Sequence, residues 1–298
     1  MTQTEGELVE AVVAARRELI TRIQGVLGLF PTSRFLTLID SHHPIGPYKY
    51  RSPALMHYDR DIEMRCPNDI AGYHAVVMLE LIERSLNAIG KRGLPAEIVE
   101  ICLANFSRIV TNIVKGDIEY MRFPNDRFDK DLAAASLRLI CAGAKKFHEI
   151  YLPIGFAKRH PFAWSRCAIK VGLRGTLYNM HLDSNDPLLM ADFNEEGLRR
   201  FYRRMAELLK RNSVKGVMGA SWYYDPALRE ISPRLAYQRS LVVENGGISM
   251  KLRASKNDVE SATRKSETRR RLYEKGEYRP TAYALIWLRD DLLAWAEG

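Results

Sequence analysis

Residues 266–288 read SETRRRLYEKGEYRPTAYALIWL, a basic stretch followed by an apolar one. Lys275 and Gly276 are typical of a helix C-terminus, and we expect a helix over about 257–275. The β-branched and aromatic residues of 281–288 predict a strand directly after it. This part of the chain therefore combines a helix with a sheet strand.

The sequence before this stretch also alternates between predicted strands and helices. Strands are predicted over 167–180 and 214–224, on either side of a helix that Asp192 or Asn194 caps and that runs to about 211. Residues 235–252 predict a hairpin, because two β-rich runs flank Asn245-Gly246-Gly247 and Asn-Gly favours a tight turn.

The first half predicts a different architecture. Apolar residues recur at helical spacing in four segments: 7–28, 71–90, 95–114 and 128–150. The proline-rich residues 31–70 predict an irregular segment. The fold class is therefore α+β, with a helical N-terminal part followed by a mixed, sheet-containing C-terminal part. We expect a mainly helical domain or extension over 1–155 and an α+β domain over 156–298.

Composition narrows the class of protein. The chain has 298 residues, of which 46% are hydrophobic and 27% charged, which excludes a disordered chain and a small disulfide scaffold. No apolar run of about 20 residues predicts a membrane span, and the acidic N-terminus lacks the features of a signal peptide. We therefore expect a cytoplasmic protein. Its four widely spaced cysteines are expected to be reduced core thiols.

The net positive charge is confined to the second half. Residues 1–150 hold 19 basic and 19 acidic side chains, whereas residues 151–298 hold 26 and 17, so the second half carries the whole net charge of +9. The basic residues gather on two predicted helices, around 199–211 and 264–271. This distribution favours a small anionic ligand as partner.

A candidate site lies at the end of the predicted strand 214–224. Three aromatic residues, Trp222, Tyr223 and Tyr224, are followed by Asp225, and Arg234 comes soon after. An arginine at a strand end can bind a carboxylate or phosphate through two parallel hydrogen bonds. Packing of an aromatic strand end against a proline turn is the structural alternative.

The segment Leu272-Tyr273-Glu274-Lys275-Gly276-Glu277-Tyr278 resembles the last helix of GNAT-type N-acyltransferases. It has one residue fewer before the glycine than the family pattern, and the chain contains no R-x-x-G-x-G/A phosphate loop. The resemblance implies transfer of an acyl group from a coenzyme A or carrier-protein thioester to an amine. It also implies that Tyr273 protonates the leaving thiolate, as a phenol can at neutral pH.

The same resemblance assigns the remaining roles. The general base would be Glu244 or Asp225. The coenzyme would be bound by residues in three places: Arg234, the glycine pair Gly246 and Gly247, and the helix residues Arg269 and Arg270. Gly246-Gly247 is the nearest glycine pair to a phosphate loop, although its neighbours favour the hairpin turn.

Two other classes of function stay open. His57-Tyr58-Asp59 is an H-x-D pair, which on a strand places both ligands on one side, and with His148 or His160 it predicts an iron(II) site of a non-haem oxygenase. The alternative is that these histidines bind no metal, and the spacing of the histidines and acids favours it. The basic second half also suits a nucleic-acid or protein-binding module, although no known nucleic-acid-binding motif accompanies it.

Overall fold

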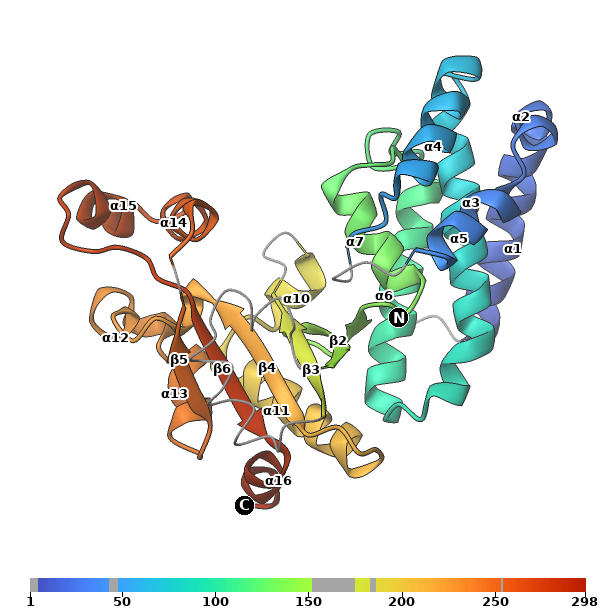
Figure 1. Ribbon diagram of the computed structural model, residues 1–298. Helices are drawn as coiled ribbons and strands as arrows, with labels where there is room; N and C mark the ends of the chain where they lie inside the picture. Colours follow the sequence, from blue (N-terminus) through green and yellow to red (C-terminus); the bar gives the residue numbers. More distant parts are fainter. Residues whose placement is uncertain (1–4, 43–47, 152–174, 183–185, 253) are drawn as a thin grey trace. The chain divides into compact units, whose positions relative to one another are not determined.

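The computed structural model describes residues 5–42, 48–151, 175–182, 186–252 and 254–298 (Figure 1). It divides the chain into two compact units, Met1–Cys141 and Ala142–Gly298. The α+β class is confirmed, with a helical unit followed by a unit that contains a mixed sheet. The division that the sequence analysis sets at residue 155 lies outside the described residues. None of the described helices has the length and apolarity needed to cross a membrane.

The first unit is built from helices around a central one. Its elements are α1 (Glu5–Arg22), α2 (Gln24–Leu29), α3 (Thr32–Asp40), α4 (Pro53–Arg65), α5 (Ile70–Ile89), η1 (Gly90–Arg92), α6 (Ala96–Val114), α7 (Asp126–Ala135) and the short β1 (Ile140–Cys141). Helix α5 is apolar on nearly all sides and packs against α1, α3, α6 and α7. A helix of this kind must be covered all round, which explains the architecture of the unit.

Two expectations for the first half are wrong. Residues 31–70 contain helices α3 and α4, because Ser52 caps α4 by accepting a hydrogen bond from the Leu55 N–H and Pro53 suits its first turn. The segment 128–150 is divided between α7 and strands instead of forming one helix. The helix ends at Ala135, and the strand β2 begins at Lys146.

In its described residues the second unit combines five strands with helices. Its elements are β2 (Lys146–Tyr151), β3 (Thr176–His181), α10 (Pro187–Ala191), α11 (Glu195–Lys210), β4 (Gly216–Ser221), η2 (Trp222–Tyr224), α12 (Leu228–Ile231), η3 (Pro233–Leu235), α13 (Tyr237–Val243), β5 (Ile248–Lys251), α14 (Lys256–Thr263), α15 (Glu267–Glu274), β6 (Tyr283–Leu288) and α16 (Arg289–Glu297). The strand order within this unit is β2-β3-β4-β6-β5. Among these described strands, β3 and β4 pair in parallel and the other pairs are antiparallel.

The two faces of this sheet follow from strand alternation. On one face, Trp287 packs against Tyr202 of α11 and Trp295 of α16, with ring centroids 5.0 Å apart in both pairs. The opposite face carries a separate apolar cluster: Leu177, Met218, Met250, Ala284 and Ile286. The predicted strands 214–224 and 281–288 are therefore neighbours in one sheet, as β4 and β6.

The predicted hairpin over 235–252 is wrong. Residues Tyr237–Val243 form α13, and only β5 is a strand. The β-branched residues adopt a helix here because it buries Gln238, Leu241 and Val242 on one side, and tertiary packing outweighs local propensity.

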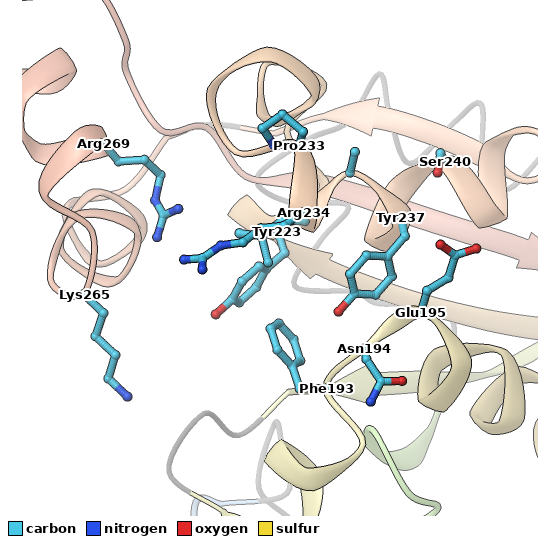
Figure 2. A pocket seen from close by; sticks show the side chains of 12 residues that line it. Phe193, Asn194, Glu195, Tyr223, Pro233, Arg234, Tyr237, Ser240, Lys265 and Arg269 are labelled. Atoms are coloured by element: carbon cyan, nitrogen blue, oxygen red, sulfur yellow. The ribbon is translucent and has the colours of Figure 1, made fainter.

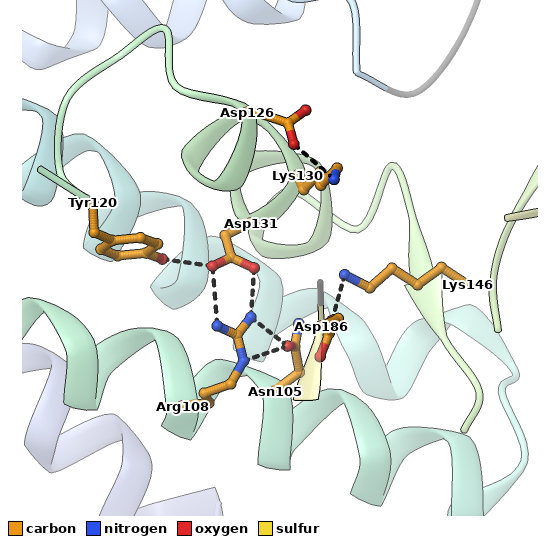
Figure 3. Close-up of polar contacts among 8 residues, drawn as sticks. All are labelled: Asn105, Arg108, Tyr120, Asp126, Lys130, Asp131, Lys146 and Asp186. Carbon is orange, nitrogen blue, oxygen red and sulfur yellow. Dashed lines mark hydrogen bonds and ion pairs between the residues drawn. The ribbon is translucent and has the colours of Figure 1, made fainter. Parts of the chain in front are cut away.

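Two aspartates of α7, one buried and one exposed, form ion pairs within the first unit (Figure 3). Asp131 is buried and forms an ion pair with Arg108 of α6, and it also accepts a hydrogen bond of 2.7 Å from the Tyr120 hydroxyl. Asp126, one turn earlier on α7, pairs with Lys130 while its own side chain is 79% exposed.

We predict that Asp131→Asn lowers the free energy of unfolding by about 1.5–3 kcal/mol, because the partly buried Arg108 and the Tyr120 hydroxyl then lose their charged hydrogen-bond partner. Asp126→Asn is the matched control on the same helix, and it should cost less than about 1 kcal/mol because its ion pair is exposed. Urea unfolding of both variants measures the difference, and equal losses would contradict the role of burial.

A histidine pair on β2 and β3 predicts a pH dependence of stability. His181 Nε2 lies 2.9 Å from His148 Nδ1, and the rings stack. Burial lowers the pKa of His148 to about 4 and that of His181 to about 3, and His148 contributes to the second shift. Below the ordinary pKa of histidine, the unfolded chain therefore binds protons that the folded chain does not.

The contribution of the neutral histidine pair to stability is therefore complete above about pH 6.5 and is lost as the pH falls towards 4. We expect the urea midpoint to fall between pH 7 and pH 4.5 by more in the wild type than in a His148→Asn/His181→Asn variant. Identical slopes for the two proteins would contradict the assignment.

Candidate functional site

The two parallel strands of the second unit separate at their carboxyl ends. Their register runs from Tyr178↔Val217 only to Met180↔Gly219. Beyond that point each strand continues with its outer partner, since His181 pairs with Lys146 of β2 and Ser221 with Tyr283 of β6. In open sheets, ligands bind outside the carboxyl ends of parallel strands, so this opening is a candidate ligand site.

A cavity of about 310 Å³ lies at this opening, and we call it the Lys145 cavity. Met180 and His181 of β3 line it, together with Ala220 and Ser221 of β4. Successive strand residues point to opposite faces of a sheet. The cavity therefore touches both faces where the strands part.

A second cavity of about 850 Å³, the Arg234 cavity, shares Tyr223, Lys265 and Arg269 with the first. Its walls include the rings of Phe193 and Tyr223, whose centroids are 5.5 Å apart. Figure 2 shows the guanidinium groups of Arg234 and Arg269 extending into the same space, with the Lys265 side chain below them. The arrangement suits an anionic ligand that also has a planar, stackable group.

Arg269 is the most unusual of these cations because it is only 5% exposed. It donates from Nε to the Ala262 carbonyl at 2.6 Å and from Nη1 to the Ser232 hydroxyl at 2.9 Å, and it lies over the Trp222 ring. Burial lowers the pKa of the Arg269 guanidinium. In the described part of the chain its contacts are all to uncharged groups, so a bound anion would supply the missing charge.

A small apolar cluster holds these residues in place. It joins the segment after β4 to α14: Trp222, Leu228, Leu235, Ala262 and Tyr278. Ser221 begins this arrangement by accepting a hydrogen bond from the Tyr223 N–H at 3.2 Å, which turns the chain out of the strand. The cluster therefore brings the basic helix α15 beside the carboxyl end of β4.

The structure brings together only some of the residues that are expected to bind the coenzyme. Arg234 and Arg269 line the Arg234 cavity, as described above. Arg270 is exposed and donates to the Arg264 carbonyl at 3.2 Å. Gly246 and Gly247 follow the C-terminus of α13, where a helix presents carbonyls instead of the N–H groups that bind phosphate.

The residues expected to perform the chemistry lie apart from one another. Tyr273 is on α15 with its side chain 42% exposed, and it does not line either cavity. Glu244 is exposed at the C-cap of α13. Asp225 is buried and accepts hydrogen bonds from the Tyr278 hydroxyl, the Thr281 N–H and the Ala227 N–H. These bonds give Asp225 a structural task.

The expected iron ligands His57 and Asp59 are not arranged as the sequence analysis assumed. His57 and Asp59 lie on α4, where residues two apart point roughly 200° from each other, so the strand geometry assumed for them is wrong. Asp59 instead contacts His74 Nε2 at 2.6 Å, while His57 is exposed. His148 contacts His181, and His160, the other expected distal ligand, lies outside the described residues. In the described ranges, no group of three or more His, Cys, Asp or Glu residues is arranged to hold a metal.

Sequence reasoning missed three residues of the Lys145 cavity: Lys145, Tyr224 as a polar group, and Gln238. Lys145 and Lys146 interrupt a run of small and aromatic apolar residues between Ala142 and Phe147, and that interruption is the only local signal. Tyr224 lies 79 residues away in the sequence, so no local pattern could join the two.

Comparison with known proteins gives a likeness of fold. No protein-family model matches the chain, and no curated protein matches its sequence. A solved structure of an acyltransferase mutant in complex with octanoyl-CoA superposes with a TM-score of 0.51 at 12% identity, over 90% of this chain and 80% of that one.

Two further solved structures are similar at lower scores. An acyltransferase in complex with CoA and 10C-teicoplanin gives a TM-score of 0.49 at 12% identity, covering 89% of this chain and 79% of that one. An acyltransferase in complex with decanoyl-CoA and teicoplanin gives 0.47 at 14% identity, covering 91% and 87%. The chain thus has the fold of the acyltransferase that was solved with octanoyl-CoA.

Proposed function

We propose that this protein transfers an acyl group from a coenzyme A thioester to an amine, in the manner of GNAT-type N-acyltransferases. The observation that carries the proposal is Arg269, a buried cation between two cavities with only uncharged partners among the described residues. Coenzyme A is an anion with several phosphate groups, which arginine recognises through paired hydrogen bonds.

Three further features support the same ligand. Arg234 and Lys265 add positive charge to the Arg234 cavity, and the rings of Phe193 and Tyr223 provide a surface against which an adenine can stack. The cavity continues to the separated strand ends through shared residues, so a long flexible donor can reach both. The acyltransferase of the same fold was solved with octanoyl-CoA.

The reaction forms one bond and breaks another. The amine nitrogen attacks the thioester carbonyl carbon, the C–S bond then breaks, and the products are an amide and a thiol. In the proposal drawn from the sequence resemblance, Tyr273 protonates the departing sulfur, and water, Glu244 or Asp225 accepts the proton of the amine. Asp225 is the less available of the two carboxylates, because three donors already hold it.

We predict that Arg269→Gln weakens binding of coenzyme A by about 10- to 100-fold, since hydrogen bonds to charged groups contribute about 1.5–3 kcal/mol each. Arg270→Gln is the matched control, because Arg270 is adjacent on the same helix but exposed. It should change the affinity less than about threefold. Titration calorimetry with coenzyme A measures both, and thermal unfolding without ligand shows whether each variant is folded.

A wild-type protein that does not bind coenzyme A, acetyl-CoA or octanoyl-CoA would refute the proposed donor. Equal weakening by Arg269→Gln and Arg270→Gln would leave a coenzyme-binding protein whose site lies elsewhere. An oligonucleotide titrated in parallel tests the alternative of nucleic-acid binding, which would weaken steeply with added salt.

The role of Tyr273 has its own test. If Tyr273 protonates the leaving thiolate, Tyr273→Phe lowers kcat by about 10- to 100-fold with little change in KM for acetyl-CoA. Release of thiol from acetyl-CoA in the presence of primary amines measures kcat. Because the Tyr273 side chain is 42% exposed, the substitution should leave stability nearly unchanged, and undiminished turnover would remove Tyr273 from the mechanism.

A further inference from the structure

Two consecutive lysines of the second unit are buried in different ways. Lys145 and Lys146 are each 1% exposed. Lys146 has the partner that a buried lysine normally requires, since its ammonium lies 2.7 Å from a carboxylate oxygen of Asp186 (Figure 3). Lys145 instead donates a hydrogen bond of 2.9 Å to the Tyr224 hydroxyl oxygen, and it lies 5.0 Å from the Tyr224 ring centroid and 5.7 Å from that of Tyr202.

Lys145 is therefore a buried cation whose described partners are a phenol and two aromatic rings. Removing an ammonium from water is costly, and a hydroxyl and ring faces repay that cost less fully than a carboxylate does. An apolar side chain at this position would stabilise the fold as well or better. The charge at Lys145 thus points to a task other than stability.

Tyr224 lines the Lys145 cavity and is polarised by the Lys145 ammonium that donates to it. It is 4% exposed, and because its oxygen accepts from Lys145, its own O–H remains to be donated. In the described part of the chain no acceptor receives that O–H. Gly219 permits the position of the ring, since a Cβ at residue 219 would lie 3.0 Å from the Tyr224 hydroxyl oxygen.

Gln238 places a complementary group in the same cavity. Its side chain is 2% exposed, and its Oε1 has no hydrogen-bond partner among the described residues. The cavity therefore offers an O–H donor backed by a positive charge, and a neutral acceptor. A thioester carbonyl oxygen requires the first when it becomes negative, and an attacking amine N–H requires the second.

We propose that Lys145 is a positioning residue for the acyl transfer, acting through Tyr224 as the catalytic hydrogen-bond donor to the thioester carbonyl oxygen. This inference rests on the proposed function. When the amine nitrogen bonds to the carbonyl carbon, the π electron pair of the C=O bond moves to the oxygen. The oxygen, now negative, accepts a hydrogen bond from the Tyr224 hydroxyl. Lys145 orients that hydroxyl and stabilises the negative charge. The pair returns to carbon as the C–S bond breaks, and the proton released by the amine ends on the sulfur as a thiol.

The first test separates stability from turnover. We expect Lys145→Met to lower kcat for thiol release from acetyl-CoA by about 100-fold, the usual loss for one preorganised donor, with the Kd of coenzyme A changed less than threefold. Its unfolding temperature should equal or exceed that of the wild type, because an apolar side chain replaces an uncompensated charge. Lys146→Met is the matched control, and its unfolding temperature should fall because Asp186 is left buried without Lys146.

The second test measures whether Lys145 and Tyr224 act together. Tyr224→Phe should lower kcat to the same extent, and the double variant Lys145→Met/Tyr224→Phe should be no slower than the slower single variant. Gly219→Ala is a further variant that removes no polar group; it displaces the Tyr224 hydroxyl and should lower kcat by about tenfold with the Kd of coenzyme A unchanged.

The outcomes distinguish the two proposals. A wild-type protein that neither binds coenzyme A nor releases thiol from acetyl-CoA refutes the proposed function and this inference with it. A wild type that turns over while Lys145→Met stays within twofold of its kcat refutes this inference alone. Additive losses in the double variant, or a lower unfolding temperature of Lys145→Met with kcat intact, would assign Lys145 a structural task and overturn the proposal.

Discussion

The separation of β3 and β4 is the constraint on which the candidate site depends. The two strands share a parallel register over only three residue pairs, after which each stays bonded to an antiparallel neighbour. The Lys145 cavity lies at this opening, and both Lys145 and the aromatic segment after β4 line it.

Buried charges show how the structure distinguishes stability from function. The buried Asp131 pairs with Arg108, and the buried Lys146 pairs with Asp186, so each buried charge has a partner of opposite sign that makes its burial tolerable. Arg269 and Lys145 instead contact uncharged groups in the described structure, and both line cavities at the strand ends. The fold thus tolerates uncompensated charge where a ligand would supply the opposite sign, and this is the physical basis of both the proposed coenzyme site and the proposed role of Lys145.

Some of the fold could be predicted because hydrophobic period is a local property. The helix 192–211 corresponds to α11, and the strands 214–224 and 281–288 to β4 and β6, since their patterns are strong and their caps are clear. The hairpin over 235–252 failed because β-branched residues at helical spacing bury one face of α13. The long helix 128–150 failed because the chain leaves α7 at Ala135 and enters the sheet at Lys146.

The sequence by itself determined the α+β class, the order of helical and mixed parts, and the confinement of the net positive charge to residues 151–298, because each is read from composition or from spacing along the chain. It also marked Arg234 and Arg269 as anion-binding candidates. Only the tertiary structure decided that Arg269 is buried while its neighbour Arg270 is exposed, and that Lys145 meets Tyr224. Burial and long-range contacts arise from strand pairing between distant segments, and no local pattern encodes which residues that pairing brings together.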